Sequence, residues 1–229
     1  MDNLIIIGAG GLAREVAAAV DAAGRYRIVG LVDDDSSLHG TTVAGRRVLG
    51  GIDQVYWDRS SYVVVCAGQG QVRQRIVDRL AAHDIGRSRF ATVVHPSVHV
   101  PPSCFVGVGT VLLAHVAVTA DARLGRHVVA MPNVTVTHDD VVGDFATLCA
   151  GVSLGGGVTV GDGAYLGTNA SVRQQVHVGA ASTLGMGATL LHDLPDGETW
   201  AGVPARPIVA ASHLTAAPHL AVLAVEEAS

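Results

Sequence analysis

One short polar stretch, Thr137-His138-Asp139-Asp140, interrupts a region whose other positions are mostly aliphatic or small. A histidine beside a carboxylate can act as a general base, because the carboxylate fixes the tautomer of the imidazole and stabilises the imidazolium ion. Such a base removes a proton from an attacking amine or hydroxyl group. We therefore take His138 and Asp139 as the candidate catalytic pair. The alternative is a solvated histidine on a turn, with no chemical role.

The region around this pair, from Val94 to Pro195, has a strict six-residue repeat. Sixteen of its seventeen repeating positions are Val or Leu, and Ala130 is the exception. The positions are Val94, Val100, Val106, Leu112, Val118, Leu124, Ala130, Val136, Val142, Leu148, Leu154, Val160, Leu166, Val172, Val178, Leu184 and Leu190. A parallel sheet wound into a coil has this period, whereas a helix or a simply alternating strand does not. Glycine often follows the aliphatic residue, where it avoids a Cβ clash at the corner. The repeat predicts a parallel β-helix.

Before the repeat, residues 1–90 alternate between predicted strands and helices. The expected elements are a strand at Leu4–Ile7, a helix to about Ala23, strands at Ile28–Val32 and Tyr62–Ala67, and a helix to about Ala82. This order is one mononucleotide-binding half of a doubly wound sheet. The sequence therefore predicts an α/β half-Rossmann domain at 1–90, an all-β parallel β-helix at 91–208 and a tail at 209–229. The tail is expected to be a short capping helix or a loose segment.

The turn after the first strand carries a loose glycine motif, formed by Gly8, Gly10 and Ala13. Glycines let the backbone approach a phosphate, and the N-terminus of the following helix supplies N–H donors. Acidic residues at the end of the second strand, Asp33 and Asp34, are placed to accept hydrogen bonds from a ribose or a base. A tight strand–helix turn without a ligand is the alternative. A nucleotide that carries a sugar fits this half-domain better than NAD does, because about ninety residues hold only half of a dinucleotide fold.

Composition limits the partners and the compartment. The net charge of −5 argues against a nucleic-acid partner, which would need a basic face. Three cysteines, Cys66, Cys104 and Cys149, form no CxxC pair and suggest a reducing compartment. A strand that begins by the third residue leaves no room for a signal peptide, and no apolar run reaches the roughly 20 residues of a membrane span. We expect a cytoplasmic protein that does not insert into a membrane.

The chain resembles the bacterial sialic acid O-acetyltransferase and nucleotide-aminosugar N-acetyltransferase family in four successive features: GAGGLAREV, VDDD, CAGQG and then a hexapeptide β-helix. The resemblance covers residues 2 to about 208. It implies a left-handed β-helix with three hexapeptides per coil. It also implies a uridine nucleotide in the small domain, with Gly8, Gly10 and Gly11 at the phosphates. Asp33 and Asp34 would then lie near the base and ribose.

The same resemblance assigns roles on the β-helix. The segment Val136–Asp144 matches the family stretch V-x-H-[DE]-x-V-I-G-[DE], which makes His138 the base and Asp139 its orienting carboxylate. Some members have an Asn where this chain has Met131 and a second His where it has Thr147. Asn133 would replace the first contact and the Thr147 hydroxyl the second, beside the acetyl group.

The C-terminal coils resemble the family's coenzyme A end, through GMGA at 185–188 and GVPARP at 202–207. Glycine backbone can hydrogen-bond the pantetheine amides, and an arginine can meet a phosphate. A plain turn that closes the β-helix is the alternative. The residues expected to bind the cofactor are Thr147, Gly167, Gly185, Gly187, Ala188, Gly202 and Arg206.

Zinc-dependent carbonic anhydrases resemble this chain in their β-helix, which implies that histidine ligands from adjacent coils would lie about eighteen residues apart, with three histidines typical of such a site. None of the eleven histidines has a partner at that spacing. We expect no metal, and we expect His115, His127, His177 and His192 to be solvated corner residues.

These observations lead to an expected activity. The resemblance implies an acetyl-CoA-dependent acetyltransferase that acts on the amine of a nucleotide-linked aminosugar, bound between the two domains. With no Cys or Ser nucleophile beside His138, the amine would attack the thioester directly. The alternatives are O-acetylation of sialic acid or another small hydroxylated metabolite, and a catalytically inactive nucleotide-binding scaffold. A long β-helix has flat faces that pack on copies of itself, and the resembling enzymes are trimers, so we expect a homotrimer.

Overall fold

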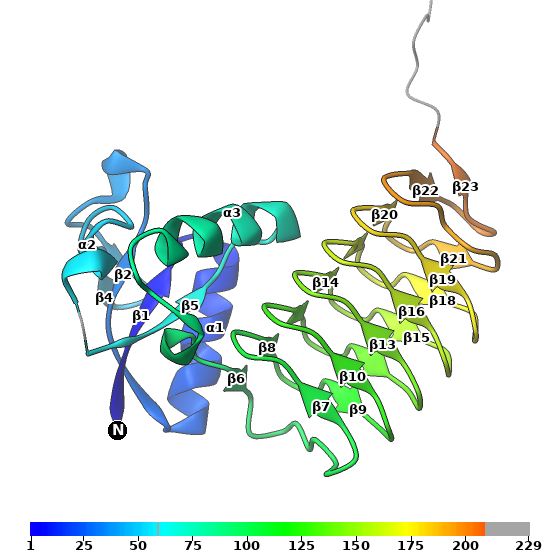
Figure 1. The fold of residues 1–229 in the computed structure, drawn as a ribbon, viewed down its shortest axis with the longest axis horizontal. Coiled ribbons are helices and arrows are strands. Elements are labelled where there is room, and N and C mark those ends of the chain that lie inside the picture. The colour runs from blue at the N-terminus through cyan, green and yellow to red at the C-terminus, as the bar shows by residue number, and fades with distance from the viewer. Residues whose placement is uncertain (59, 209–229) are drawn as a thin grey trace, which may run out of the picture.

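The chain folds into an N-terminal α/β domain and a parallel β-helix, as the computed structural model of residues 1–58 and 60–208 shows (Figure 1). This confirms the predicted fold class, an α/β domain with a parallel sheet followed by a parallel β-helix. The predicted tail, 209–229, lies outside the described residues. None of the helices in the described part is long and apolar enough to span a bilayer.

The N-terminal domain is built on a three-stranded parallel sheet with the order β2-β1-β5. Its strands are β1 (Asp2–Ile7), β2 (Tyr26–Val32) and β5 (Tyr62–Val65). Residues Leu4 to Ile7 are almost completely buried, as expected for a strand covered on both faces. Helix α1 (Gly11–Ala23) ends at Gly24, whose φ of 64° is the left-handed conformation typical of a helix C-terminus.

The remaining elements of this domain are short, apart from one helix. They are η1 (Ser36–Leu38), β3 (Thr42–Val43), β4 (Arg46–Arg47), α2 (Gln54–Trp57), α3 (Gly70–Ala81) and η2 (Arg87–Arg89). Of these, the sequence predicted only α3. Elements of two to four residues leave too short a pattern for periodicity to detect.

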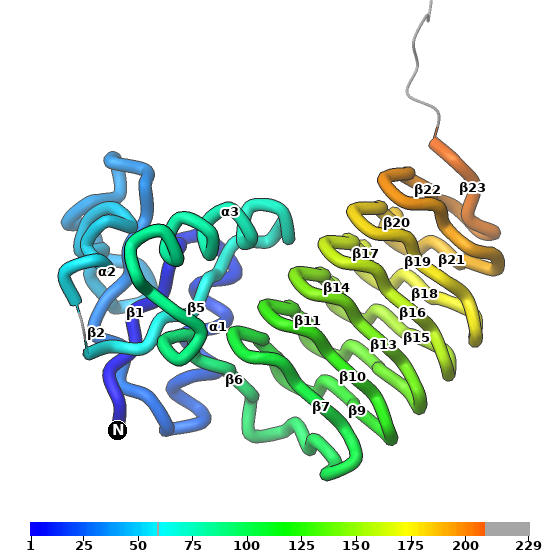
Figure 2. The backbone as a smooth tube through the Cα atoms, in the orientation of Figure 1, coloured from blue at the N-terminus to red at the C-terminus, as the bar shows by residue number. Residues whose placement is uncertain are grey.

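The β-helix consists of short strands on three faces, and its coils stack along one axis (Figure 2). The first face contains β7 (Phe105–Val106), β10 (Arg123–Leu124), β13 (Val141–Val142), β16 (Thr159–Val160) and β19 (His177–Val178). The second face contains β6 (Val93–Val94), β8 (Val111–Leu112), β11 (Val129–Ala130), β14 (Thr147–Leu148), β17 (Tyr165–Leu166), β20 (Thr183–Leu184), β22 (Thr199–Ala201) and β23 (Arg206–Pro207). The third face contains β9 (Ala117–Val118), β12 (Thr135–Val136), β15 (Ser153–Leu154), β18 (Ser171–Val172) and β21 (Thr189–Leu190).

The six-residue repeat marks the inward residue of each of these strands from β6 to β21. Val100 is the one repeat position outside a strand, because residues 95–104 connect β6 to β7 irregularly. Four-residue corners join the strands from β7 to β21. The third residue of every such corner, from Gly109 to Gly187, has a positive φ. Glycine is required at the first position of some corners for a different reason, which is the close approach of the next coil. A Cβ on Gly161 would lie 2.5 Å from the main-chain nitrogen of Ala180 in the next coil.

The N-terminal domain packs against the second face near the start of the β-helix (Figure 1). Val111 and Val129, which point outward from this face, share a buried cluster with Ala13 and Val16 of α1. Arg73 of α3 lies in the same interface and is 1% exposed. One prediction fails here, because His127 is buried and not solvated. Its ring stacks on Phe145 and meets Phe90 edge-on, since the N-terminal domain covers this corner.

Candidate active site

His138 and Asp139 lie on the corner between β12 and β13, where the third face meets the first. We call residues 137–140 the base corner. The two side chains are each 67% exposed, and Nδ1 of His138 is 2.8 Å from Oδ2 of Asp139. With its proton on Nδ1, the imidazole donates to the carboxylate and keeps a free lone pair on Nε2. That is the arrangement a general base needs.

Asp140, the third polar residue of the base corner, has a different role. Its carboxylate is buried and accepts hydrogen bonds from the main-chain N–H of Thr137 at 2.6 Å and of Val158 at 2.8 Å. Burial raises the pKa of this carboxyl group, although the hydrogen bonds oppose the shift. Because Val158 belongs to the next coil, Asp140 holds the base corner in place from inside.

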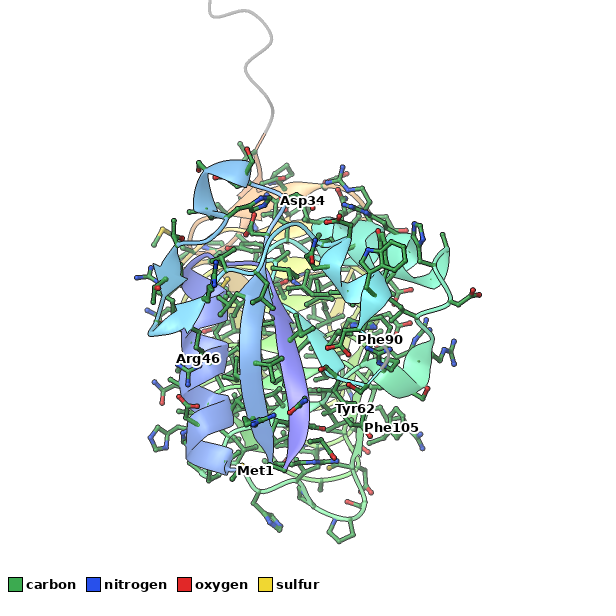
Figure 3. The ribbon with its side chains drawn as sticks, turned by 90° about the vertical axis from the view of Figure 1, so that its left-hand side faces the viewer. Met1, Asp34, Arg46, Tyr62, Phe90 and Phe105 are labelled. Atoms are coloured by element: carbon green, nitrogen blue, oxygen red, sulfur yellow. The ribbon has the colours of Figure 1, made fainter. Side chains whose placement is uncertain are left out.

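A cavity of about 500 Å³ opens at the carboxyl end of the N-terminal sheet. Four of the residues predicted from sequence line this cavity: Gly8, Gly10, Asp33 and Asp34. Asp34 lies at the end of the sheet opposite Met1 (Figure 3). A Cβ on Gly8 would come within 2.9 Å of the carbonyl oxygen of Cys66, and its φ is 107°, so this position requires glycine.

Both carboxylates in this cavity also bind the protein itself. Asp33 Oδ2 accepts from the main-chain N–H of Ala9 at 2.8 Å, which fixes the glycine turn against the end of β2. Asp34 accepts from the N–H of Ile52 at 3.0 Å and from Nη1 of Arg79 at 2.6 Å. Arg79 and Arg75 of α3 line the cavity and were not predicted, because an arginine on an exposed helix face carries no sequence signal.

A second cavity, of about 660 Å³, lies between the domains. It shares the lining residues Ala67 and Val72 with the first cavity and continues to the second face of the β-helix. Its polar lining residues are Gln69, Gln71, Tyr165, Ser182 and Thr183. None of these residues was predicted, since residues about a hundred positions apart meet here only through domain packing. The motif Gly68-Gln69-Gly70 was the available signal.

The structure separates several residues that the sequence analysis placed together. Thr147 is fully buried in the domain interface, where its hydroxyl donates to the carbonyl oxygen of Gly68 at 2.8 Å. Asn133 lies on the corner between the second and third faces. The predicted cofactor residues Gly167, Gly185, Gly187 and Ala188 lie along that same corner, which we call the glycine corner. Gly202 comes directly after β22, and Arg206 lies in β23. None of these lies on the base corner of the same chain.

Comparison with known proteins defines the family. A family model described as the PglD N-terminal domain matches residues 3–80. The acetyltransferase domain of PglB from Neisseria gonorrhoeae FA1090 is 32% identical, with a TM-score of 0.81 over 91% of this chain and 100% of that chain. PerB from Caulobacter crescentus, solved with CoA and GDP-perosamine, is 31% identical, with a TM-score of 0.83 over 90% of this chain and 97% of that chain.

The chain belongs to the PglD-like family of nucleotide-sugar N-acetyltransferases. The predicted resemblance is therefore confirmed. A curated relative of this PglD-like chain, UDP-N-acetylbacillosamine N-acetyltransferase of Bacillus subtilis (strain 168), is 32% identical over 119 residues. That alignment covers 50% of this chain and 52% of the relative, so it spans about half the length of the curated protein. Within residues 1–58 and 60–208, no group of three or more His, Cys, Asp or Glu side chains could hold a metal ion.

Proposed function

We propose that this PglD-like protein transfers an acetyl group from acetyl-CoA to the amine of a nucleotide-linked aminosugar. The His138–Asp139 contact at 2.8 Å carries the proposal, because it supplies a candidate base on the fold of an N-acetyltransferase family. The Bacillus relative is named for N-acetylation of a UDP-linked sugar, and PerB was solved with CoA and a GDP-linked sugar. These parallels favour the amine over the hydroxyl acceptor and over an inactive scaffold.

In the proposed reaction the amine nitrogen attacks the carbonyl carbon of the thioester. Nε2 of His138 accepts the proton that the nitrogen loses, and Asp139 stabilises the resulting imidazolium. The C–S bond then breaks and the CoA thiolate leaves, to be protonated by the imidazolium or by solvent. The developing oxyanion needs a donor. Gly156, next to the imidazole in the following coil, is our candidate. Its neighbours Gly155 and Gly157 donate their N–H groups to Val172 and His138, whereas Gly156 has no such acceptor among the described residues.

The acceptor's nucleotide would occupy the cavity at the end of the N-terminal sheet. Neither α1 nor α3 has a side-chain cap at its N-terminus, so their first N–H groups are available to a diphosphate. Asp33 and Asp34 each retain lone pairs that could accept from the ribose or base, although both already accept from the protein. From there the sugar would extend into the cavity between the domains.

We further propose a homotrimer whose active sites are shared between protomers. The N-terminal domain covers the second face, the base corner lies where the third and first faces meet, and the glycine corner is a third edge. A protomer therefore carries its nucleotide cavity, its base and its predicted CoA residues in separate places. A neighbouring β-helix can bring its base corner up to this protomer's cavity and glycine corner.

The three cysteines are free, which agrees with a cytoplasmic location.

Two experiments test these points. CoA release from acetyl-CoA should be measured with UDP-, GDP- and dTDP-linked aminosugars and with free sialic acid. Turnover only with a nucleotide-linked amine supports the proposal, turnover with sialic acid supports the O-acetyl alternative, and no turnover with any of them supports a scaffold.

The second experiment mixes two inactive variants, His138→Ala and one that cannot bind nucleotide, after dissociation and reassembly. Shared sites should restore about one quarter of wild-type activity under random assortment. Sites built within one protomer would restore none.

A further inference from the structure

Three consecutive glycines, Gly155-Gly156-Gly157, form the corner one coil beyond the base corner. Two of them have reasons that recur throughout the β-helix. A Cβ on Gly155 would lie 2.6 Å from the main-chain nitrogen of Gln174, and Gly157 has a φ of 70°. Neither reason applies to Gly156. Its φ lies outside the left-handed region, and no main-chain atom is among the three nearest neighbours of an added Cβ.

The three atoms nearest to a Cβ added at position 156 all belong to the imidazole of His138. A Cβ added to Gly156 would lie 2.3 Å from Cε1 and 2.3 Å from Nε2 of His138. The ring therefore occupies the space that a side chain at 156 would fill, with its Cε1–Nε2 edge directly over the glycine. That edge carries the nitrogen that must accept the proton.

The fold itself tolerates side chains at this place. Gly156 is the second residue of its corner, and it is the only glycine among the second residues of the regular corners from β7 to β21. The others are Val108, Ala114, Ala120, Arg126, Pro132, His138, Asp144, Ala150, Asp162, Thr168, Gln174, Ala180 and Met186. The sequence thus departs from its own pattern where the neighbouring coil carries the base.

We propose that Gly156, besides offering its N–H, positions His138, because the missing Cβ of this glycine lets the imidazole lie against the next coil. Asp139 holds the Nδ1 side of the ring and the bare Gly156 leaves room for the Nε2 side. This inference rests on the proposed function, since it takes His138 as the base. A methyl group at 156 would displace the ring by about 1 Å, and a misplacement of that size can lower a rate by roughly a hundredfold.

The test is a double-mutant cycle on acetyl transfer with Gly156→Ala and His138→Ala. Gly156→Ala should lower kcat by roughly 10- to 100-fold, while the KM values of both substrates stay within about twofold. In the His138→Ala background the same change should alter residual kcat by less than about threefold, because there is no imidazole to displace. Gln174→Ala, at the same corner position one coil further on, is the matched control and should keep wild-type kcat.

Several results would overturn the proposal. Full activity in Gly156→Ala would do so, as would an equal loss in both backgrounds, which would mean that the glycine acts on the substrate or fold independently of the imidazole. A Gly156→Ala protein that fails to fold would show that the coil needs the glycine. If His138→Ala retains full turnover, the proposed base falls as well. If His138→Ala is inactive and Gly156→Ala is fully active, only the positioning role is lost.

Discussion

Nη2 of Arg73 donates a hydrogen bond to the carbonyl oxygen of Phe145 at 2.6 Å, across the boundary between the two domains. The other guanidinium donors are also used. Nε reaches the carbonyl oxygen of His127, Nη2 also reaches Ala146, and Nη1 reaches Ala67 and Gly68 within its own domain. All five N–H groups therefore have acceptors, as a buried guanidinium requires. Burial lowers the pKa of Arg73 to about 10, so the group stays charged at neutral pH.

Arg73 should therefore be a major contributor to the stability of the domain interface. Arg73→Lys keeps the charge but has three donors and no planar fork, so buried carbonyls lose their partners at about 1–3 kcal/mol each. We expect the free energy of unfolding to fall by about 2–4 kcal/mol in urea titrations. Arg87→Ala, which removes an exposed arginine, should change it by less than about 0.5 kcal/mol. Equal stability of Arg73→Lys and wild type would refute this role.

His127 should make the protein sensitive to acid. Its Nδ1 is buried without a hydrogen-bond partner among the described residues, and burial, helped by Arg126 and Arg73, lowers its pKa to about 4. In the unfolded chain the His127 imidazole is protonated near pH 6.5, whereas in the folded protein it is protonated only near pH 4. Stability should therefore fall as the pH drops from about 6.5 to 4, by up to about 3 kcal/mol from this group alone.

The matched variant is His127→Phe, because Phe145 occupies the equivalent corner position in the next coil with a φ of 60°. This variant keeps an aromatic ring between Phe90 and Phe145 and removes the titrating group. Thermal unfolding from pH 7 to 4 should show a shallower loss of stability than in wild type. An unchanged pH dependence would mean that His127 does not titrate in this way.

Asp34 should matter for the nucleotide and not for acetyl-CoA. Losing a hydrogen bond to a charged acceptor costs about 1.5–3 kcal/mol, so Asp34→Ala should raise the KM of the nucleotide sugar roughly tenfold to a hundredfold. The KM of acetyl-CoA should not change. Asp35→Ala is the control, because its carboxylate accepts from Ser37 and does not line the cavity. If both variants have the wild-type KM, Asp34 serves only to hold Arg79 and Ile52.

Much of the fold could be predicted because the repeat reports burial directly. An inward aliphatic residue is needed once per strand, so positions such as Val136 and Val142 mark β12 and β13 without further information. Gly8 and the end of α1 at Ala23 were likewise predictable, since turn glycines and helix boundaries are set locally. The His138–Asp139 pair was recognisable because its polarity interrupts the repeat.

The contacts between the domains could not be predicted in this way. The resemblance implies a coil with three faces, but neither it nor the repeat shows which of these faces the N-terminal domain covers. Thr147 was expected beside the acetyl group, yet it lies under that domain, bonded to Gly68. His127 was expected in solvent for the same reason and is buried. Arg73 resembles any arginine on an amphipathic helix, and Gly156 resembles any turn glycine until the ring above it is seen.

The most direct test of the mechanism is the turnover of His138→Ala with the true acceptor. The side chain is 67% exposed and its neighbours Val136 and Val142 supply the inward contacts, so the variant should stay folded and bind acetyl-CoA. Its kcat should fall by about 10²–10⁴-fold, the usual contribution of a general base. Asp139→Asn should lose less, since the imidazole remains. A folded His138→Ala protein with near wild-type kcat would contradict the account and would make His115 the next residue to test.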